Sequence, residues 1–468
     1  MKKISLIYVS ALFITLTFSS CENWFDISAK SELKADDLLN NEQGFRDALI
    51  GCYASMKSDN LYGAQLTMTY MDCLGQYYST AKTTQNRFYY AANYDYTKTE
   101  EEQRKDLIWK NLYNVISNVN SIVDRIDGKK NVFPTGVHAL LKGEALGLRA
   151  YLHLDILRMF APAPNMKEGL QAKAIPYVDH FTNMLFEQLT VGQVLDRVVE
   201  DLTEARELLA GVDPYGPKHA DFDLKALEGV WKGREYRMNY YAATALLARA
   251  LLYRGLPEDK NKAFQYAKEV IDSSLFPLIS SEDLKSSDDN GFVKENIFSL
   301  EYSGIKDDIV NKYFVVDERA YEFLGTNKST LKRIFPATLD MDYRRQWWLD
   351  AAGSNFTITK YNASKRVPLL KVSELYLIAA ETAPTLDLTN QYFNTLQYHR
   401  GLPKEDVTAE SLSKTILAEY AKEFIGEGQL FYAYKRMSNN VKPILKSPIP
   451  NPESVYVIPL PKENTFFK

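Results

Sequence analysis

The chain has 468 residues, of which 46% are hydrophobic and 25% are charged, the balance of a globular protein that buries a sizeable core. Its formal net charge of −4 excludes the strongly basic composition of nucleic-acid-binding proteins, so we expect no nucleic-acid partner. Aromatic residues make up 13% of the chain, including 31 tyrosines, and such residues serve either a core or a surface that contacts sugars or proteins.

The N-terminus has the zones of a secretory signal. Two lysines precede an uncharged stretch over 4–18, and two serines then lead to Cys21. The stretch is short for a transmembrane helix. This order resembles the bacterial lipobox, in which the signal peptide is cut before a cysteine that is then acylated, although Phe18 departs from the preferred Leu, Val or Ile. We expect residues 1–20 to be a lipoprotein signal peptide and Cys21 to be lipidated; the alternative is a soluble secreted protein with an incidental Cys21.

Apolar residues recur at spacings of three and four in eight segments, which predicts amphipathic helices. The predicted helices cover 40–56, 107–126, 138–160, 190–209, 239–255, 261–273, 367–382 and 414–437, and Thr190 is the expected N-cap of the fourth. Long irregular stretches lie between them at 57–105, 210–238 and 274–366, and long ordered loops are usually functional. Because no low-complexity linker interrupts the chain, residues 21–468 are predicted to form a single domain.

The pair of segments at 239–255 and 261–273 is typical of a tetratricopeptide unit. Alanines at 242, 245 and 248 line the first segment, and alanines at 263 and 267 line the second, so the two helices can approach closely. No clean 34-residue period runs through the chain. The predicted fold is all-α, with tetratricopeptide-like helical pairs that form a right-handed superhelical scaffold, long irregular loops and few short strands.

Two cysteines remain after Cys21. Cys52 and Cys73 could pair in an oxidising compartment, but Cys52 lies in a helical pattern where a buried free thiol is equally plausible. The sequence leaves both possibilities open.

Two aromatic stretches are candidates for a ligand site, because a sugar site needs aromatic faces and a few polar groups. The first lies in 71–96, with Asp72, Gln76, Tyr77, Tyr78, Arg87, Tyr89, Tyr90, Asn93, Tyr94 and Tyr96. The second lies in 340–350, with Trp347 and Trp348. The alternative is that these rings pack the loops onto the helical core.

Gly426 and Gly428 flank Glu427 inside the predicted helix over 414–437, where each glycine costs roughly 1 kcal/mol relative to alanine. We expect the glycines to let a backbone or a ring approach closely, and Glu427 to lie at a packed junction where a carboxylate needs partners. Its expected partners are Lys435, Arg436, Arg149 or Arg158.

The sequence carries no signature of a common enzyme class. We find no Gly-x-Ser-x-Gly, no His-Glu-x-x-His, no phosphate-binding glycine loop and no dinucleotide fingerprint. The five histidines are scattered, and His153 is interpreted as structural. We expect no catalysis, no metal and no cofactor, although the separation of a glycosidase carboxylate pair cannot be read from a sequence.

Four segments, in order, resemble the SusD/RagB family of outer-membrane nutrient-binding lipoproteins. They are the mature start over 21–56, "GEALGLRAYLHLDILRMFAPAP" (143–164), "VEDLTEARELL" (199–209), and the end formed by "KEFIGEGQLFYAYKRM" (422–437) and "VYVIPLPKEN" (455–464). Departures from the family pattern occur at Lys422, Leu430 and the pair Ala433-Tyr434.

The resemblance implies a cell-surface lipoprotein, anchored in the outer membrane and facing the exterior, that binds a nutrient such as an oligosaccharide. It also implies a TonB-dependent, SusC-like transporter as the partner, and ligand contacts from the loop around 71–96. The alternatives are a helical scaffold or lid subunit with little ligand binding of its own, and the binding of a non-glycan nutrient such as a peptide.

Overall fold

The computed structural model describes residues 35–218, 233–286, 291–316, 321–336, 340–438, 442–445 and 452–462. The predicted signal peptide and Cys21 lie outside the described residues. No helix in these ranges combines the length and the apolar character that crossing a membrane requires.

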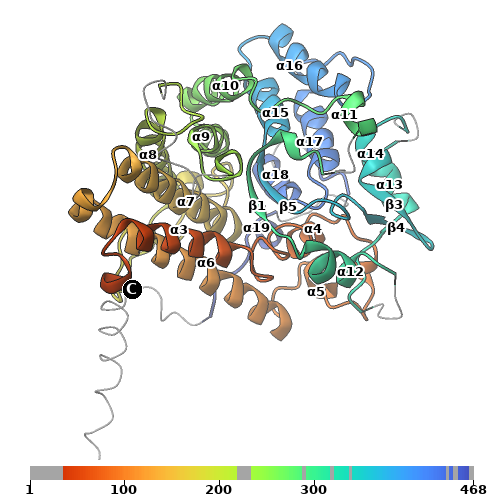
Figure 1. Ribbon diagram of the computed structural model, residues 1–468. Helices are drawn as coiled ribbons and strands as arrows, with labels where there is room; N and C mark the ends of the chain where they lie inside the picture. The colour runs from red at the N-terminus through yellow and green to blue at the C-terminus, as the bar shows by residue number, and fades with distance from the viewer. Residues whose placement is uncertain are drawn as a thin grey trace, which may run out of the picture.

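Within the described ranges, ten longer helices form a stack in which most of them contact the next helix in chain order (Figure 1). They are α3 (Glu42–Met56), α6 (Thr99–Ile126), α7 (Val137–Phe160), α8 (Val191–Ala210), α9 (Tyr240–Arg254), α10 (Pro257–Asp272), α15 (Val372–Thr382), α16 (Leu386–Tyr398), α17 (Leu412–Glu423) and α18 (Gln429–Met437). From α6 to α10 each helix contacts the next, and α10 then contacts α15. The predicted all-α fold of tetratricopeptide-like pairs is confirmed.

The alanines predicted to bring two helices together are buried at the contact between α9 and α10. Ala242, Ala245, Ala248, Ala263 and Ala267 have no exposed surface. Thr190 caps α8 as expected, because its hydroxyl accepts the backbone N–H of Gln193 and the Gln193 side chain accepts the backbone N–H of Thr190. Local sequence signals therefore place these helices correctly.

The irregular stretches contain short elements that cover one side of the helical stack. They are α4 (Tyr70–Leu74), η1 (Thr80–Lys82), α5 (Tyr89–Ala92), η6 (Arg234–Tyr236), α11 (Ser281–Ser286), η8 (Lys306–Val310), α12 (Asn311–Tyr313), α13 (Lys328–Ile334) and α14 (Tyr343–Trp347); another short helix, α19 (Pro452–Tyr456), follows α18. In Figure 1, α13, α14, β3 and β4 lie at the right, α4 lies to the left of β4, and α5 and α12 lie lower.

Two small antiparallel sheets complete the fold. Strand β1 (Asn296–Glu301) pairs with β5 (Arg366–Lys371), and β4 (Asn355–Ile358) lies between β2 (Thr326–Asn327) and β3 (Leu349–Ala352). The predicted helix over 367–382 is therefore wrong in its first five residues, which belong to β5. A short apolar run fits a buried strand and a buried helix equally well, and here pairing with β1 decides.

The predicted helix over 414–437 is also interrupted. Helix α17 ends at Glu423 and α18 begins at Gln429, because Gly426 and Gly428 both adopt the left-handed conformation, with φ of 79° and 71°. Helix α16 was not predicted; it begins after an N-cap at Thr385. Cys52 and Cys73 are both buried free thiols, and burial raises the pKa of Cys52 to about 12.

Candidate ligand-binding face

The segment 70–96 folds back on itself and is fixed to the break between α17 and α18 by Asp72. Its carboxylate accepts the backbone N–H groups of Gly426 at 2.6 Å and Gly428 at 2.9 Å, and the Tyr78 hydroxyl oxygen lies 3.3 Å from the same carboxylate. Burial raises the pKa of Asp72 to about 8, against the lowering effect of these donors. Asp72 thus binds the chain itself.

Four tyrosines of the same segment are buried and donate their hydroxyl protons to backbone carbonyls. The acceptors are Ala421 for Tyr77 (2.9 Å), Met68 for Tyr78 (2.7 Å), Leu74 for Tyr94 (2.8 Å) and Val455 for Tyr96 (2.7 Å). A buried hydroxyl needs such a partner, and here each partner is main chain. These rings form the floor of the segment and offer no face to a ligand.

Two further predicted site residues are buried. The Gln76 amide donates to the carbonyls of Cys73 and Ala92, and its backbone has a positive φ of 70°. The Trp348 ring has no exposed surface, and the Lys360 ammonium lies 3.8 Å from its centre. The sequence could not distinguish these packing roles from ligand contact, because both require aromatic and amide side chains.

The remaining predicted residues of this segment keep exposed surface. Tyr89 and Tyr90 are half-buried in α5, with ring centres 5.4 Å apart in an edge-to-face arrangement, and Asn93 is exposed after them. Arg87 is half-buried and pairs with Glu322 at 2.8 Å. Two rings, an amide and a guanidinium group therefore lie together beside α5.

The neighbouring loop adds a residue that the sequence analysis missed. Arg87 donates its backbone N–H to the carbonyl of Tyr321 at 2.9 Å, and the Tyr321 side chain is 55% exposed. Thr80 and Asn86 hold the same loop through the carbonyl of Phe323, each at 2.9 Å. The sequence feature that could have identified Tyr321 is its position within a charged stretch. We define Arg87, Tyr89, Tyr90, Asn93 and Tyr321 as the loop face.

Trp347 does not belong to the loop face. It is half-buried at the end of α14, and Figure 1 shows α14 and α5 at separate places on the same side of the molecule. The two aromatic stretches predicted from the sequence are therefore not brought together.

Glu427 lies between the two glycines and is 4% exposed. It pairs with Lys371 at 2.7 Å and with Lys360, so its expected partners were wrong. The expected partners are engaged elsewhere: Arg149 pairs with Asp201, Arg158 with Asp155 and Arg436 with Glu381, whereas Lys435 donates to the carbonyl of Arg158. Sequence neighbours did not supply the counter-charges, because the break turns Glu427 toward β5.

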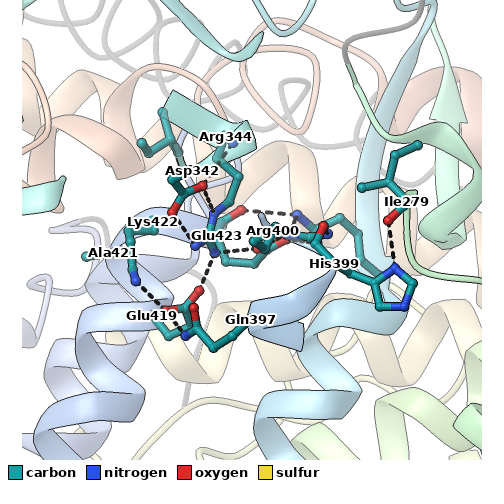
Figure 2. Close-up of polar contacts among 12 residues, drawn as sticks. Ile279, Asp342, Arg344, Gln397, His399, Arg400, Glu419, Ala421, Lys422 and Glu423 are labelled. Carbon is teal, nitrogen blue, oxygen red and sulfur yellow. Dashed lines mark hydrogen bonds and ion pairs between the residues drawn. The ribbon is translucent and has the colours of Figure 1, made fainter. Parts of the chain in front are cut away.

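A buried network of ion pairs continues from Glu427 into the interior. Figure 2 shows Glu423 between Arg344 and Arg400; its carboxylate accepts from Arg344 at 2.8 Å and from Arg400 at 2.9 and 3.0 Å. Arg344 also pairs with Asp342 and Glu419, and Arg400 with Glu295. Despite burial, these cations and Lys371 hold the pKa of Glu423 well below its ordinary value. The network joins α14, α17 and β5 beneath the loops.

His153 occupies a buried position as a neutral ring, as its structural interpretation expected. Its Nδ1–H donates to the carbonyl of Arg149 and its Nε2 accepts the N–H of Val178, both at 2.9 Å, and the ring stacks on Tyr177. Burial lowers its pKa to about 3.

Two adjoining cavities of about 210 and 540 Å³ flank the loop over 176–187, and they share His180 and Phe186. Trp109 and Tyr113 line the smaller cavity, and Arg197 lines the larger one. These two cavities, which have aromatic and charged lining residues, lie in the helical stack between α6 and α8. Within the described parts of the chain, no group of His, Cys, Asp or Glu side chains is arranged to hold a metal ion.

Comparison with known proteins agrees with this architecture. A family model described as "Starch-binding associating with outer membrane" matches residues 23–216, and a model described as "SusD family" matches residues 321–450. The SusD-like protein P25 of Formosa agariphila is 24% identical over 210 residues, which cover 43% of this chain and only 38% of that protein.

Solved structures share the fold. A SusD superfamily protein from Bacteroides thetaiotaomicron superposes with a TM-score of 0.68 at 20% identity, over 89% of this chain and 93% of that one. A putative sugar binding protein from Bacteroides vulgatus has a TM-score of 0.66 at 22% identity, over 85% and 87% of the two chains. The ordered sequence motifs, the helical architecture and the two family matches lead to one conclusion: this chain belongs to the SusD/RagB family.

Proposed function

We propose that this protein is a cell-surface lipoprotein that binds an oligosaccharide at the loop face and delivers it to a TonB-dependent outer-membrane transporter. Family membership supports the nutrient-binding role. The proposal assigns no catalysis to the chain. The mature protein would begin at Cys21 and carry its anchor there.

The observation that carries the proposal is the contrast between buried and exposed aromatics in one segment. Tyr77, Tyr78, Tyr94 and Tyr96 are hydrogen-bonded to the main chain, whereas Tyr89 and Tyr90 of the same segment keep exposed surface. Aromatic rings on a rigid support can stack on the apolar faces of sugar rings with little loss of conformational entropy.

Polar groups beside the rings would orient a bound sugar through hydrogen bonds. The Asn93 amide can donate and accept, and the Arg87 guanidinium, already oriented by Glu322, has further N–H donors for sugar hydroxyls. The Tyr321 hydroxyl is exposed at the edge of the same face. Rings with adjacent donors and acceptors suit a neutral polyhydroxylated ligand better than an apolar one.

Isothermal titration of the mature protein against neutral and acidic oligosaccharides and short peptides tests this assignment. Tyr89→Ala and Tyr90→Ala are each expected to weaken saccharide binding roughly tenfold, by loss of about 1–2 kcal/mol of ring contact. Phe186→Ala is the matched control, because it removes a ring from the cavities near α8. Equal affinity in the Tyr variants, or loss in the control alone, would place the site elsewhere. Peptide binding without saccharide binding would change the ligand class.

The anchor and the partner need separate tests. A radioactive fatty acid is expected to label the wild type but not Cys21→Ser. The Cys21→Ser variant is also expected to be lost from the outer-membrane fraction. Purification under mild detergent is expected to recover the transporter. Recovery of the protein alone would contradict the partner assignment without affecting the binding site.

A further inference from the structure

A cavity of about 320 Å³ lies between the C-terminal half of α3, the segment 233–237 and the β1–β5 pair. Its lining includes Lys57, Tyr236, Arg237, Ser299, Glu301 and Arg366. The volume is at the lower end of the range for small-molecule sites, enough for one sugar unit. None of these residues belongs to the loop face.

Cationic groups dominate this lining. Among the described residues, neither Lys57 nor Arg366 has an ion-pair partner within 4 Å. The third cation, Arg237, is already compensated, since it donates to Glu144 at 2.6 Å. The cavity therefore contains two unpaired positive charges and a single carboxylate, that of Glu301, among its lining side chains. This balance favours a negatively charged ligand.

The Arg366 guanidinium is held in place by a ring. It stacks on Tyr236, although Glu301 lies directly opposite Arg366 in the β1–β5 ladder. A stacked guanidinium keeps its N–H edge free for bidentate contact with a planar or tetrahedral oxyanion. Arg366 is thus oriented by an aromatic contact, and its N–H edge has no hydrogen-bond partner in the part of the chain that the structure describes.

Ser299 supplies a second, independent indication of a ligand. Ser299 lines the cavity and is 4% exposed, and its hydroxyl, which is buried next to the cavity, has no hydrogen-bond partner among the described residues. Ser299 faces Pro368 across the ladder, and proline has no N–H to offer it. A buried hydroxyl without a partner is costly, so a ligand oxygen that accepts its proton would be stabilised there.

We propose that this cavity binds the oxyanion of an acidic saccharide unit, either the carboxylate of a hexuronic acid or a sulfate ester. Arg366 would contact the oxyanion in bidentate fashion, Lys57 would add a second charge, and Ser299 would donate its hydroxyl proton. The inference builds on the proposed saccharide-binding function and assigns a charged substituent to its ligand.

Single-sugar probes test the cavity independently of the loop face. Binding of sodium glucuronate, galactose 6-sulfate and glucose to the mature protein is measured by titration at constant ionic strength. The acidic sugars are expected to bind and glucose is expected to bind at least tenfold more weakly. Arg366→Gln and Lys57→Gln are each expected to weaken the acidic probes roughly tenfold, the scale of one charge-assisted contact. Ser299→Ala should weaken them severalfold.

Two controls make the result specific. Glu301→Gln removes the cavity's own carboxylate and is expected to strengthen the acidic probes, which a general loss of folding cannot do. Lys262→Gln, at an exposed position of α10, is expected to change nothing. A binding signal on titration with sodium chloride equal to the signal with the acidic sugars would overturn the proposal. Unchanged affinity of Arg366→Gln for the acidic sugars would also overturn it.

The two proposals fail in different ways. Binding of neutral oligosaccharides that depends on Tyr89 and Tyr90, with no preference for acidic sugars, overturns the cavity proposal and leaves the function standing. Binding of acidic sugars that depends on Arg366, with no effect of Tyr89→Ala or Tyr90→Ala, supports the cavity and overturns the loop face as the main site.

Discussion

The carboxylate of Asp72 accepts the backbone N–H of Gly426 at 2.6 Å, across 354 residues of sequence. A second oxygen of Asp72 accepts the N–H of Gly428, so one side chain near the N-terminus fixes the break between two C-terminal helices. Four of the five loop-face residues belong to the segment 70–96, which Asp72 fixes to this break. The geometry of the loop face therefore depends on contacts that no local sequence pattern contains.

Replacement of Asp72 by alanine should destabilise the fold and spare ligand affinity. Two buried N–H groups would lose their acceptor, each at about 1–3 kcal/mol, so we expect a loss of about 2–6 kcal/mol in the free energy of unfolding. Urea denaturation measures this loss, and titration of the folded variant measures affinity. Unchanged stability together with lost affinity would show that Asp72 contacts ligand.

Replacement of Gly428 by alanine should also destabilise the protein. A Cβ there would lie 2.3 Å from the carbonyl oxygen of Leu66, and the residue has a φ of 71°. We expect a loss of about 2 kcal/mol or more, because left-handed strain and a backbone clash add. Gly51→Ala is the matched control: its Cβ would meet nothing within 4 Å, and in α3 it should stabilise by up to about 1 kcal/mol. Equal melting temperatures would contradict this account.

Neutralisation of Glu427 should be far more costly than neutralisation of an exposed glutamate. Glu427→Gln leaves Lys360 and Lys371 buried without the carboxylate that they share, and breaking such a buried group costs about 3–5 kcal/mol. Glu200→Gln on α8, 64% exposed beside Arg197, should cost less than about 1 kcal/mol. Thermal melting compares the two. A collapse in ligand affinity with unchanged melting of Glu427→Gln would refute its structural role.

His153 should make the protein less stable in acid. Its folded pKa of about 3 lies below its ordinary value of about 6.5, so between these values the unfolded chain binds a proton that the folded chain does not. Its contribution is fully present above pH 6.5 and is lost as the pH falls, by about 2 kcal/mol at pH 5. Urea denaturation at pH 7 and pH 5 should show a smaller difference for His153→Gln than for the wild type. If the stability difference between pH 7 and pH 5 is the same for both proteins, the pKa of His153 is not lowered in the folded state.

Local sequence information determined the helical scaffold. Apolar periodicity placed α3 and α6 to α10 because each of these helices buries one face or nearly all of its surface against its neighbours, and Thr190 marked the start of α8. The alanines of α9 and α10 signalled close packing for the same reason. The family resemblance followed from the order of such local motifs.

Only the tertiary structure decided which aromatics are exposed and where the last helix breaks. Tyr77 and Tyr89 belong to one tyrosine-rich stretch, yet Tyr89 keeps exposed surface whereas Tyr77 is buried. The Tyr77 hydroxyl donates to the carbonyl of Ala421, 344 residues away. Likewise, Glu427 acquired its partners from β5 and the turn before it, outside its own segment. Helical periodicity is a property of neighbouring residues, whereas burial, counter-charges and backbone acceptors come from distant parts of the chain, so the sequence determined the scaffold and the tertiary contacts decided the face that it presents.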